Sequence, residues 1–197
     1  MKKIIALIGF VVIFTACDVA QQLAGAYNMT QCKYAYNSIS GLTLDGINLT
    51  NASGLSALNP LTLAKLVSAF SSPSGNLPLN FTLNLDVTNP NPQAALLNGL
   101  SYILEIDNVE LTQGVINRQV EIAGNGKSVL PLVLGFDLKK TASGQSLDAL
   151  KNIIFNFAGI GGNPSNVTFR IKPNFTIGGN TFTAPAYIPV SFTLNKK

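Results

Sequence analysis

The chain has 197 residues, of which 47% are hydrophobic and only 11% are charged. This composition excludes an intrinsically disordered chain, which would be polar and self-repelling, and it leaves room for one packed domain with a processed leader. Thirteen Lys and Arg face nine Asp and Glu, and the balance is only +2 without Lys2 and Lys3 of the leader, so we expect no nucleic-acid partner.

The first residues predict a secretion signal. Met1–Lys3 is positively charged and is followed by an apolar run of eleven residues, Ile4–Phe14. A transmembrane helix needs about 20 apolar residues, whereas the apolar region of a signal peptide has about 7–15. The sequence Phe14-Thr15-Ala16-Cys17 resembles the lipobox of bacterial lipoproteins. We therefore expect residues 1–16 to be a lipoprotein signal peptide, cleaved between Ala16 and Cys17, with lipid attached to Cys17.

An ordinary signal peptide cleaved near Ala16 is the alternative, and it would leave Cys17 free to form a disulfide with Cys32 in an oxidising compartment. If Cys17 carries lipid instead, Cys32 is a lone thiol. We interpret it as a small packed residue, because the chain has no His to activate it. Two or three acyl chains anchor a protein stably. We therefore expect the membrane as a partner and a place in the cell envelope, at the outer membrane, the periplasmic face of the inner membrane or the cell surface.

The next two segments precede the main domain. Residues 17–31 are small and polar without sustained periodicity, which predicts a lipid-anchored tether. Residues 32–76 are expected to add strands and a short helix that pack on the domain. A strand or bulged strand pair is indicated by alternating apolar residues, which are Leu42, Leu44, Ile47 and Leu49. The helix is predicted over residues 60–70, with Asn59 as its N-cap and Pro60 at its first position.

From residue 77 onward, short alternating runs are separated by turn residues. Strands are predicted at 80–88, 100–107, 109–115, 120–122, 128–138, 167–177 and 188–194. Gly124–Lys127 predicts a hairpin turn, and residues 147–157 predict a second helix capped by Ser146. The pattern as a whole predicts a mainly β protein, an Ig-like antiparallel β-sandwich with Greek-key connections and one or two short helices.

Two stretches carry a resemblance to a known family. They are Leu85-Asp86-Val87-Thr88-Asn89-Pro90-Asn91-Pro92 and Gly99-Leu100-Ser101-Tyr102-Ile103-Leu104-Glu105-Ile106. With them the chain resembles the LEA type 2 family, also called the WHy (water stress and hypersensitive response) domain, over about residues 77–197. The resemblance implies a small Ig-like β-sandwich and an association with desiccation and stress tolerance. The segment 39–76 departs from the family pattern.

The Asn89-Pro90-Asn91-Pro92 element is interpreted as a structural turn. Its prolines fix φ and cannot donate to a strand ladder, while its asparagines can bond nearby backbone groups. A role in recognition is the alternative. Gly99 and Tyr102 fit the strand motif of the family position by position.

Few residues suggest chemistry. Gly126-Lys127-Ser128 echoes the end of a phosphate-binding loop, but Glu121 stands where that motif needs glycine and a strand follows, so a hairpin is preferred. A Lys127–Ser128 dyad has no supporting motif. Three carboxylates on or beside separate strands lack the spacing of a metal site and are interpreted as solvent-facing charges: Asp86, Asp107 and Asp137. We therefore expect no catalytic residue, no metal and no cofactor.

These observations predict a membrane-anchored lipoprotein whose LEA type 2-like sandwich is a non-enzymatic module for stress or desiccation protection or for interaction. The alternative is an adaptor that binds one protein partner of the envelope through an exposed sheet edge.

Overall fold

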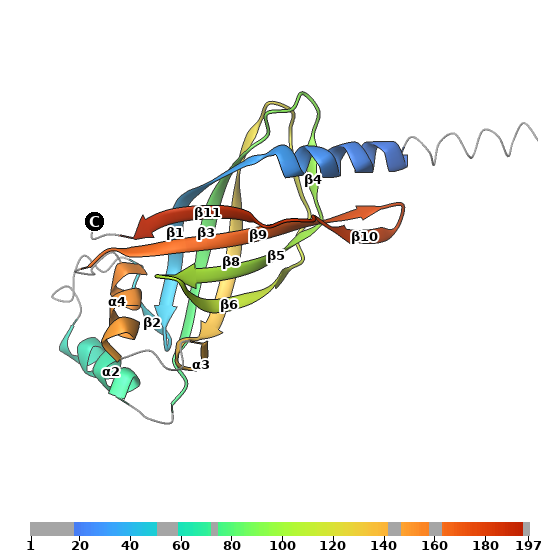
Figure 1. Cartoon of the computed structure of the whole chain (residues 1–197). Coiled ribbons are helices and arrows are strands. Elements are labelled where there is room, and N and C mark those ends of the chain that lie inside the picture. The colour runs from blue at the N-terminus through green and yellow to red at the C-terminus, as the bar shows by residue number, and fades with distance from the viewer. Residues whose placement is uncertain (1–17, 51–58, 72–74, 142–146, 158–162, 195–197) are drawn as a thin grey trace, which may run out of the picture.

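The computed structural model describes residues 18–50, 59–71, 75–141, 147–157 and 163–194. The predicted signal peptide, Ala16, Cys17 and the predicted cap Ser146 lie outside these residues. The described part consists mainly of antiparallel strands in two facing sheets, with short helices at both ends (Figure 1).

The first sheet has the strand order β2-β1-β3-β8. Its strands are β1 (Lys33–Leu44), β2 (Ile47–Asn48), β3 (Pro78–Thr88) and β8 (Lys127–Asp137). β3 pairs with β8 along its whole length, from Pro78 opposite Asp137 to Thr88 opposite Lys127. Apolar residues alternate with polar ones in β3, and every apolar position faces the core, since a strand turns successive side chains to opposite faces.

The second sheet has the order β10-β9-β5-β6, with β11 also paired to β9. Its strands are β5 (Gly99–Ile106), β6 (Val109–Ile116), β9 (Ser165–Ile177), β10 (Asn180–Thr183) and β11 (Ile188–Leu194). In Figure 1 these strands cross those of the first sheet, and the inner faces of both sheets share one cluster of buried apolar side chains. The structure confirms the predicted antiparallel β-sandwich, and the chain crosses between the sheets after β3, β6 and β8.

Helices α2 (Pro60–Ser71), α3 (Leu138–Thr141) and α4 (Leu147–Phe157) gather at one end of the sandwich (Figure 1). The predicted N-cap of α2 is confirmed, because the Asn59 Oδ1 atom accepts a 2.8 Å hydrogen bond from the Thr62 amide. Phe70 of α2 packs edge-on against Phe155 of α4 with ring centroids 6.5 Å apart. Val67 shares the helical spacing of Phe70, yet 64% of its surface is exposed.

Two expectations are wrong in part. The segment 17–31 is predicted to be a lipid-anchored tether without sustained periodicity, but residues 18–31 form a helix that packs on the sandwich with Ala26 and Met29 buried. The structure also contains more than the two helices expected, because α3 and this N-terminal helix join the two that periodicity predicts. A further two-stranded sheet, β4 (Ala95–Leu97) with β7 (Val120–Ile122), lies near the N-terminal helix in Figure 1.

Candidate functional site

The Asn89 side chain is the centre of a polar cluster between the sandwich and the N-terminal helix. Asn89 is 0% exposed, and its Nδ2 atom donates to the backbone carbonyls of Gln93 at 2.8 Å and of Ile122 and Ala123 at 3.1 Å. A buried amide is tolerated only when its hydrogen bonds are made. Asn89 therefore joins the segment after β3 to the segment between β7 and β8.

Asn91 extends this cluster toward the N-terminal helix. The Asn89 Oδ1 atom accepts hydrogen bonds from the amide and from the Nδ2 atom of Asn91, both at 3.0 Å. The Asn91 Nδ2 atom also donates to the Asn28 carbonyl at 3.3 Å. Pro90 and Pro92 are exposed, so their missing N–H groups leave no buried site unsatisfied. We call Asn28, Asn89 and Asn91, with the carbonyls they bind, the asparagine hub.

A glycine lets the second segment approach the hub closely. A Cβ atom on Gly124 would lie 2.0 Å from the Pro92 carbonyl oxygen, closer than any real contact. The next residue, Asn125, has a positive φ of 53° and donates its amide to the Asn91 carbonyl at 2.8 Å. A tight turn is therefore found at the predicted place, and it packs on the Asn-Pro-Asn-Pro element. It is not the predicted hairpin, because β7 pairs with β4 and β8 pairs with β3.

The N-terminal helix is fixed to the sandwich at both of its ends. Near its end, the Asn28 Nδ2 atom donates to the Ala94 carbonyl at 3.0 Å. Near its start, the Gln22 Oε1 atom accepts from the Gly178 amide at 2.9 Å. Between them, Gly25 lies so close to Leu96 that a Cβ atom would meet the Leu96 Cγ atom at 2.5 Å. The helix is thus part of the folded domain.

Cys32 follows this helix and is buried. Its Sγ atom donates to the Asn28 carbonyl at 3.4 Å, and burial raises the pKa of the thiol to about 11. A thiol with such a pKa is not ionised at neutral pH, and the thiolate is the reactive form. The interpretation of Cys32 as a packed residue is confirmed.

On the outer side of the first sheet, the neighbouring strands β1 and β3 carry a set of small neutral polar groups, while β8 beside them exposes Val129 and Val133. The Asn84 Nδ2 atom of β3 donates to the hydroxyls of Ser38 at 3.1 Å and of Ser40 at 3.2 Å on β1. Thr82 lies opposite Ser40 in the same ladder. We call Ser38, Ser40, Thr82 and Asn84 the polar face.

The three aspartates have separate structural contacts. Asp86, beside the polar face, binds Lys127 with 2.9 Å between Oδ2 and Nζ, and hydrogen bonds from Lys127 and then Asn37 lower its pKa. The Asp107 Oδ1 atom accepts from the Asn166 amide at 2.8 Å. Within the described ranges, no three His, Cys, Asp or Glu side chains are grouped as metal ligands would be.

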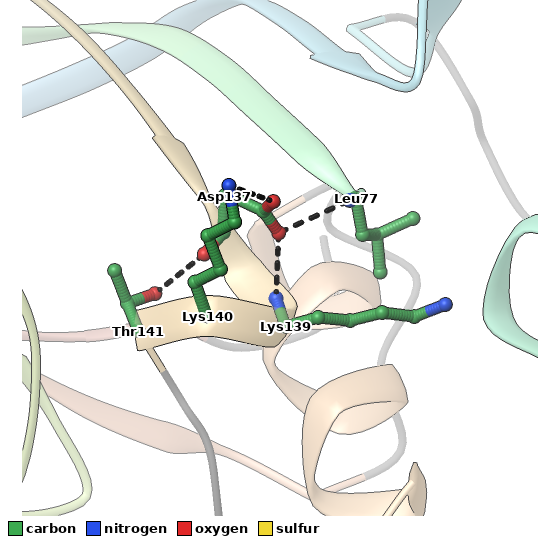
Figure 2. A network of polar contacts seen from close by, with 5 residues as sticks. All are labelled: Leu77, Asp137, Lys139, Lys140 and Thr141. Carbon is green, nitrogen blue, oxygen red and sulfur yellow. Dashed lines mark hydrogen bonds and ion pairs between the residues drawn. The ribbon is translucent and has the colours of Figure 1, made fainter. Parts of the chain in front are cut away.

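Asp137 is not the solvent-facing charge that its position suggested. Figure 2 shows its carboxylate between the end of β8 and the start of β3, where Oδ1 accepts from the amides of Leu77 and Lys139, both at 3.1 Å. It is thus the N-cap of α3 and also holds two segments of chain together. The Lys140 Nζ atom lies 3.7 Å from Oδ2.

A groove of about 760 Å³ runs beside the N-terminal helix. It is lined mainly by neutral side chains, with four glutamines and the carboxylates of Asp18 and Glu121, and contains no Ser, Thr, Cys or Lys. No helix in the described part is long and apolar enough to cross a membrane.

Comparison with known proteins decides the family. Residues 84–188, more than half of the chain, match the family model of the late embryogenesis abundant protein, LEA type 2. The chain belongs to the LEA type 2 family. A comparison with curated proteins found no significant match.

Solved structures similar to this LEA type 2 chain are distant in sequence. A crystal structure of a protein from Archaeoglobus fulgidus is 15% identical, covers 64% of this chain and 91% of its own, and has a TM-score of 0.38. A solution structure from Arabidopsis thaliana is 13% identical, covers 59% and 71%, and has a TM-score of 0.40. A solution structure described as a late embryogenesis abundant protein is 14% identical, covers 99% and 87%, and has a TM-score of 0.36.

The motif residues of the LEA type 2 domain have structural contacts. The ring of Tyr102 on β5 stacks on that of Phe169 with centroids 5.5 Å apart, and Gly114 on β6 leaves the space for it. A Cβ atom on Gly99 would lie 2.8 Å from the Ile116 carbonyl oxygen. Sequence reasoning located the Asn-Pro-Asn-Pro turn but missed Asn28, since its partner carbonyls are more than sixty residues away.

Proposed function

We propose that the chain is a lipoprotein of the cell envelope that is anchored by lipid on Cys17 and presents its LEA type 2 domain as a non-enzymatic module for protection against water stress. The leader and lipobox support the anchor. The family membership supports the stress-related role, and the polar face is the structural observation that carries it.

The geometry of the N-terminal helix argues against the rival disulfide. Residues 18–31 are helical, so the Cα atoms at the two ends are about 20 Å apart at 1.5 Å per residue. Each cysteine lies one residue beyond an end, within about 3.8 Å of its neighbour's Cα atom. The Cα atoms of Cys17 and Cys32 therefore stay at least about 12 Å apart, whereas a disulfide needs less than about 7 Å. Cys17 is left available for lipid while the helix is intact.

The polar face is suited to replace water on drying surfaces. Its hydroxyls and amides can both donate and accept hydrogen bonds. They carry no charge, so binding to neighbouring groups needs no ion desolvation. Strand pairing holds them at regular spacing, and mutual hydrogen bonds already order them. The face can therefore satisfy polar groups of headgroups or proteins that lose their water, without selecting one partner.

The anchor is tested by the intact mass of the membrane-fraction protein, with wild type compared with Cys17→Ala. The proposal requires a chain that begins at Cys17 and carries two or three acyl chains, and it requires their loss in the variant. A soluble, unmodified wild-type protein would refute the anchor.

Protection is tested with the full chain reconstituted in phosphatidylcholine vesicles. A drying-sensitive reporter enzyme is dried together with these vesicles, and the enzyme activity that returns on rehydration is measured. Ser40→Ala with Thr82→Val removes two hydroxyls from the polar face and should lower recovery. Thr168→Val with Ser191→Ala removes two hydroxyls from the second sheet, where they lie 3.3 Å apart, and serves as the control. Equal recovery with both variants would contradict the role of the polar face.

An adaptor is the second candidate, and the sheet edges specify where it would bind. The ring of Tyr36 on β1 stacks on Phe192 of β11 at 4.0 Å, which closes one side of the sandwich. β6 is an edge strand of the second sheet, because no described strand pairs with the side that faces away from β5. Its residue Val115 is exposed. Crosslinking in cells would favour the adaptor if one stoichiometric partner is captured by wild type and lost with Val115→Asp. A diffuse set that is unchanged by the variant favours protection.

A further inference from the structure

The N-terminal helix exposes three large apolar side chains along one side. Val19, Leu23 and Tyr27 recur at every fourth residue, and 39%, 58% and 64% of their surfaces are exposed. Residues four apart lie on the same face of an α-helix. Ala26, three residues after Leu23, borders this side of the helix and is buried against the domain together with Met29. Val19 lies at the same border, with its Cγ2 atom 3.7 Å from where a Cβ atom on Gly178 would be. A surface helix of a soluble domain normally turns polar and charged residues outward, whereas this helix also turns three large apolar side chains toward solvent. We call Val19, Leu23 and Tyr27 the apolar stripe.

Phe182 adds a further exposed apolar side chain beside the start of this helix. It lies on β10 directly opposite Phe175 of β9, and directly paired residues of antiparallel strands share one face of the sheet. Phe175 is buried and, with Ala26 of the helix, lines a small cavity. Phe182 therefore projects on the helix side of the β9–β10 hairpin, and it is 51% exposed.

We propose that the apolar stripe, with Phe182 beside it, lies in the interfacial layer of a lipid bilayer. The inference rests on the proposed lipid anchor and extends it. The stripe starts two residues after Cys17, so a lipid on that cysteine would hold the helix at the membrane surface. Contact with the interface would bury the three side chains without any further protein.

The composition of the helix favours a neutral lipid interface as the occupant. Asp18 is the only charged residue between positions 18 and 31, and the other exposed positions are apolar or amide side chains. Tyrosine is enriched at the membrane interface, where its ring is apolar and its hydroxyl remains hydrated. Because no Lys or Arg lies on the helix, attraction to anionic lipids contributes nothing. Binding should therefore be insensitive to salt and to the fraction of anionic lipid.

The docked helix would also orient the domain. The asparagine hub and the Gln22–Gly178 hydrogen bond hold the helix rigidly against the sandwich. Helices α2 and α4 lie at the opposite end of the molecule in Figure 1. A helix that lies flat in the interface would therefore direct the α2–α4 end away from the bilayer, which a flexible lipid tether alone could not do.

A single tryptophan can test this directly, because the chain has none of its own. Leu23→Trp places the probe in the stripe, and Val67→Trp places it at an exposed apolar position of α2 as the matched control. Each full chain is purified from membranes, its acylation is read by intact mass, and it is reconstituted in phosphatidylcholine vesicles with and without brominated acyl chains. If Leu23→Trp does not fold, Tyr27→Trp places the tryptophan probe in the same stripe.

The expected result is that emission from the stripe probe shifts to shorter wavelength and is quenched by the brominated lipid, at low and at high salt, while the Val67→Trp control shows neither effect. Acylated protein whose stripe probe behaves like the control would overturn the inference and leave the anchor intact. A shift without quenching would also overturn it, because protein would then cover the stripe. Unacylated protein whose stripe probe is quenched by added vesicles would refute the anchor and support the stripe.

Discussion

Asn89 is the residue on which three separate segments depend. Its amide nitrogen donates to three backbone carbonyls and its oxygen accepts from Asn91, while the Asn89 side chain itself is fully buried. No other side chain of similar size offers donors and an acceptor in this geometry. The family motif at this position is therefore explained by hydrogen bonding within the fold, which supports the structural interpretation of the Asn-Pro-Asn-Pro turn over a role in recognition.

Replacing Asn89 should be costly. Asn89→Ala leaves the carbonyls of Gln93, Ile122 and Ala123 without this donor, and we expect the free energy of unfolding to fall by about 3 kcal/mol. Urea unfolding followed by circular dichroism measures the change. Asn180→Ala removes an exposed amide on β10 and should change stability by less than about 0.5 kcal/mol. Equal unfolding midpoints for the two variants would contradict the role of the hub.

Asp137 should make stability depend on acid. Desolvation raises its pKa, but hydrogen bonds from three backbone amides and the charge of Lys140 outweigh this, so the pKa lies below the ordinary value of 3.8. A lowered pKa in the folded state stabilises the protein above pH 3.8, and this contribution is lost as pH falls from there through the folded-state pKa. Asp137→Asn should therefore be less stable than wild type at neutral pH, and the difference should shrink in acid. A difference that does not change with pH would exclude the charge as its cause.

At the scale of elements, alternation and capping predicted most of the strands and two helices, while the N-terminal helix was missed. The strands could be predicted because one face of each is buried, which imposes a period of two. The helix packs through Gly25, Ala26, Asn28 and Met29, of which only Met29 is a large apolar residue, so its burial leaves no apolar period. β4 has only three residues, too few for alternation to be recognised, and it was not predicted.

The docking of the N-terminal helix should fail when Gly25 is enlarged. A Cβ atom there already meets Leu96 at 2.5 Å, so Gly25→Leu must separate the helix from β4. We expect faster amide exchange over residues 18–31 and a loss of about 1–3 kcal/mol in the free energy of unfolding. Ala20→Leu places the same side chain at an exposed position of the helix and should preserve protection. Equal exchange in both variants would mean that the helix is not held by this contact.

At the scale of the whole molecule, a β-sandwich must prevent its edge strands from pairing with other chains. β8 is an edge of the first sheet. The Arg118 Nη1 atom binds the Pro131 carbonyl at 3.2 Å, so this carbonyl points away from β3. The amide and carbonyl of a strand residue point to the same side, so the missing N–H of Pro131 also falls on the open edge. Proline and arginine together thus block the middle of this edge.

Opening this edge should therefore cause association. Arg118→Ala with Pro131→Val restores an outward N–H and frees the carbonyl between Val129 and Val133, which are both exposed. We expect the double variant to form larger assemblies than wild type, as measured by size-exclusion chromatography with light scattering. Val133→Thr changes an exposed side chain on the same strand without touching its backbone groups, so it should behave as wild type. If the double variant also keeps the wild-type mass, β8 is protected by something other than these two residues, and the adaptor hypothesis must then consider this edge as well as β6.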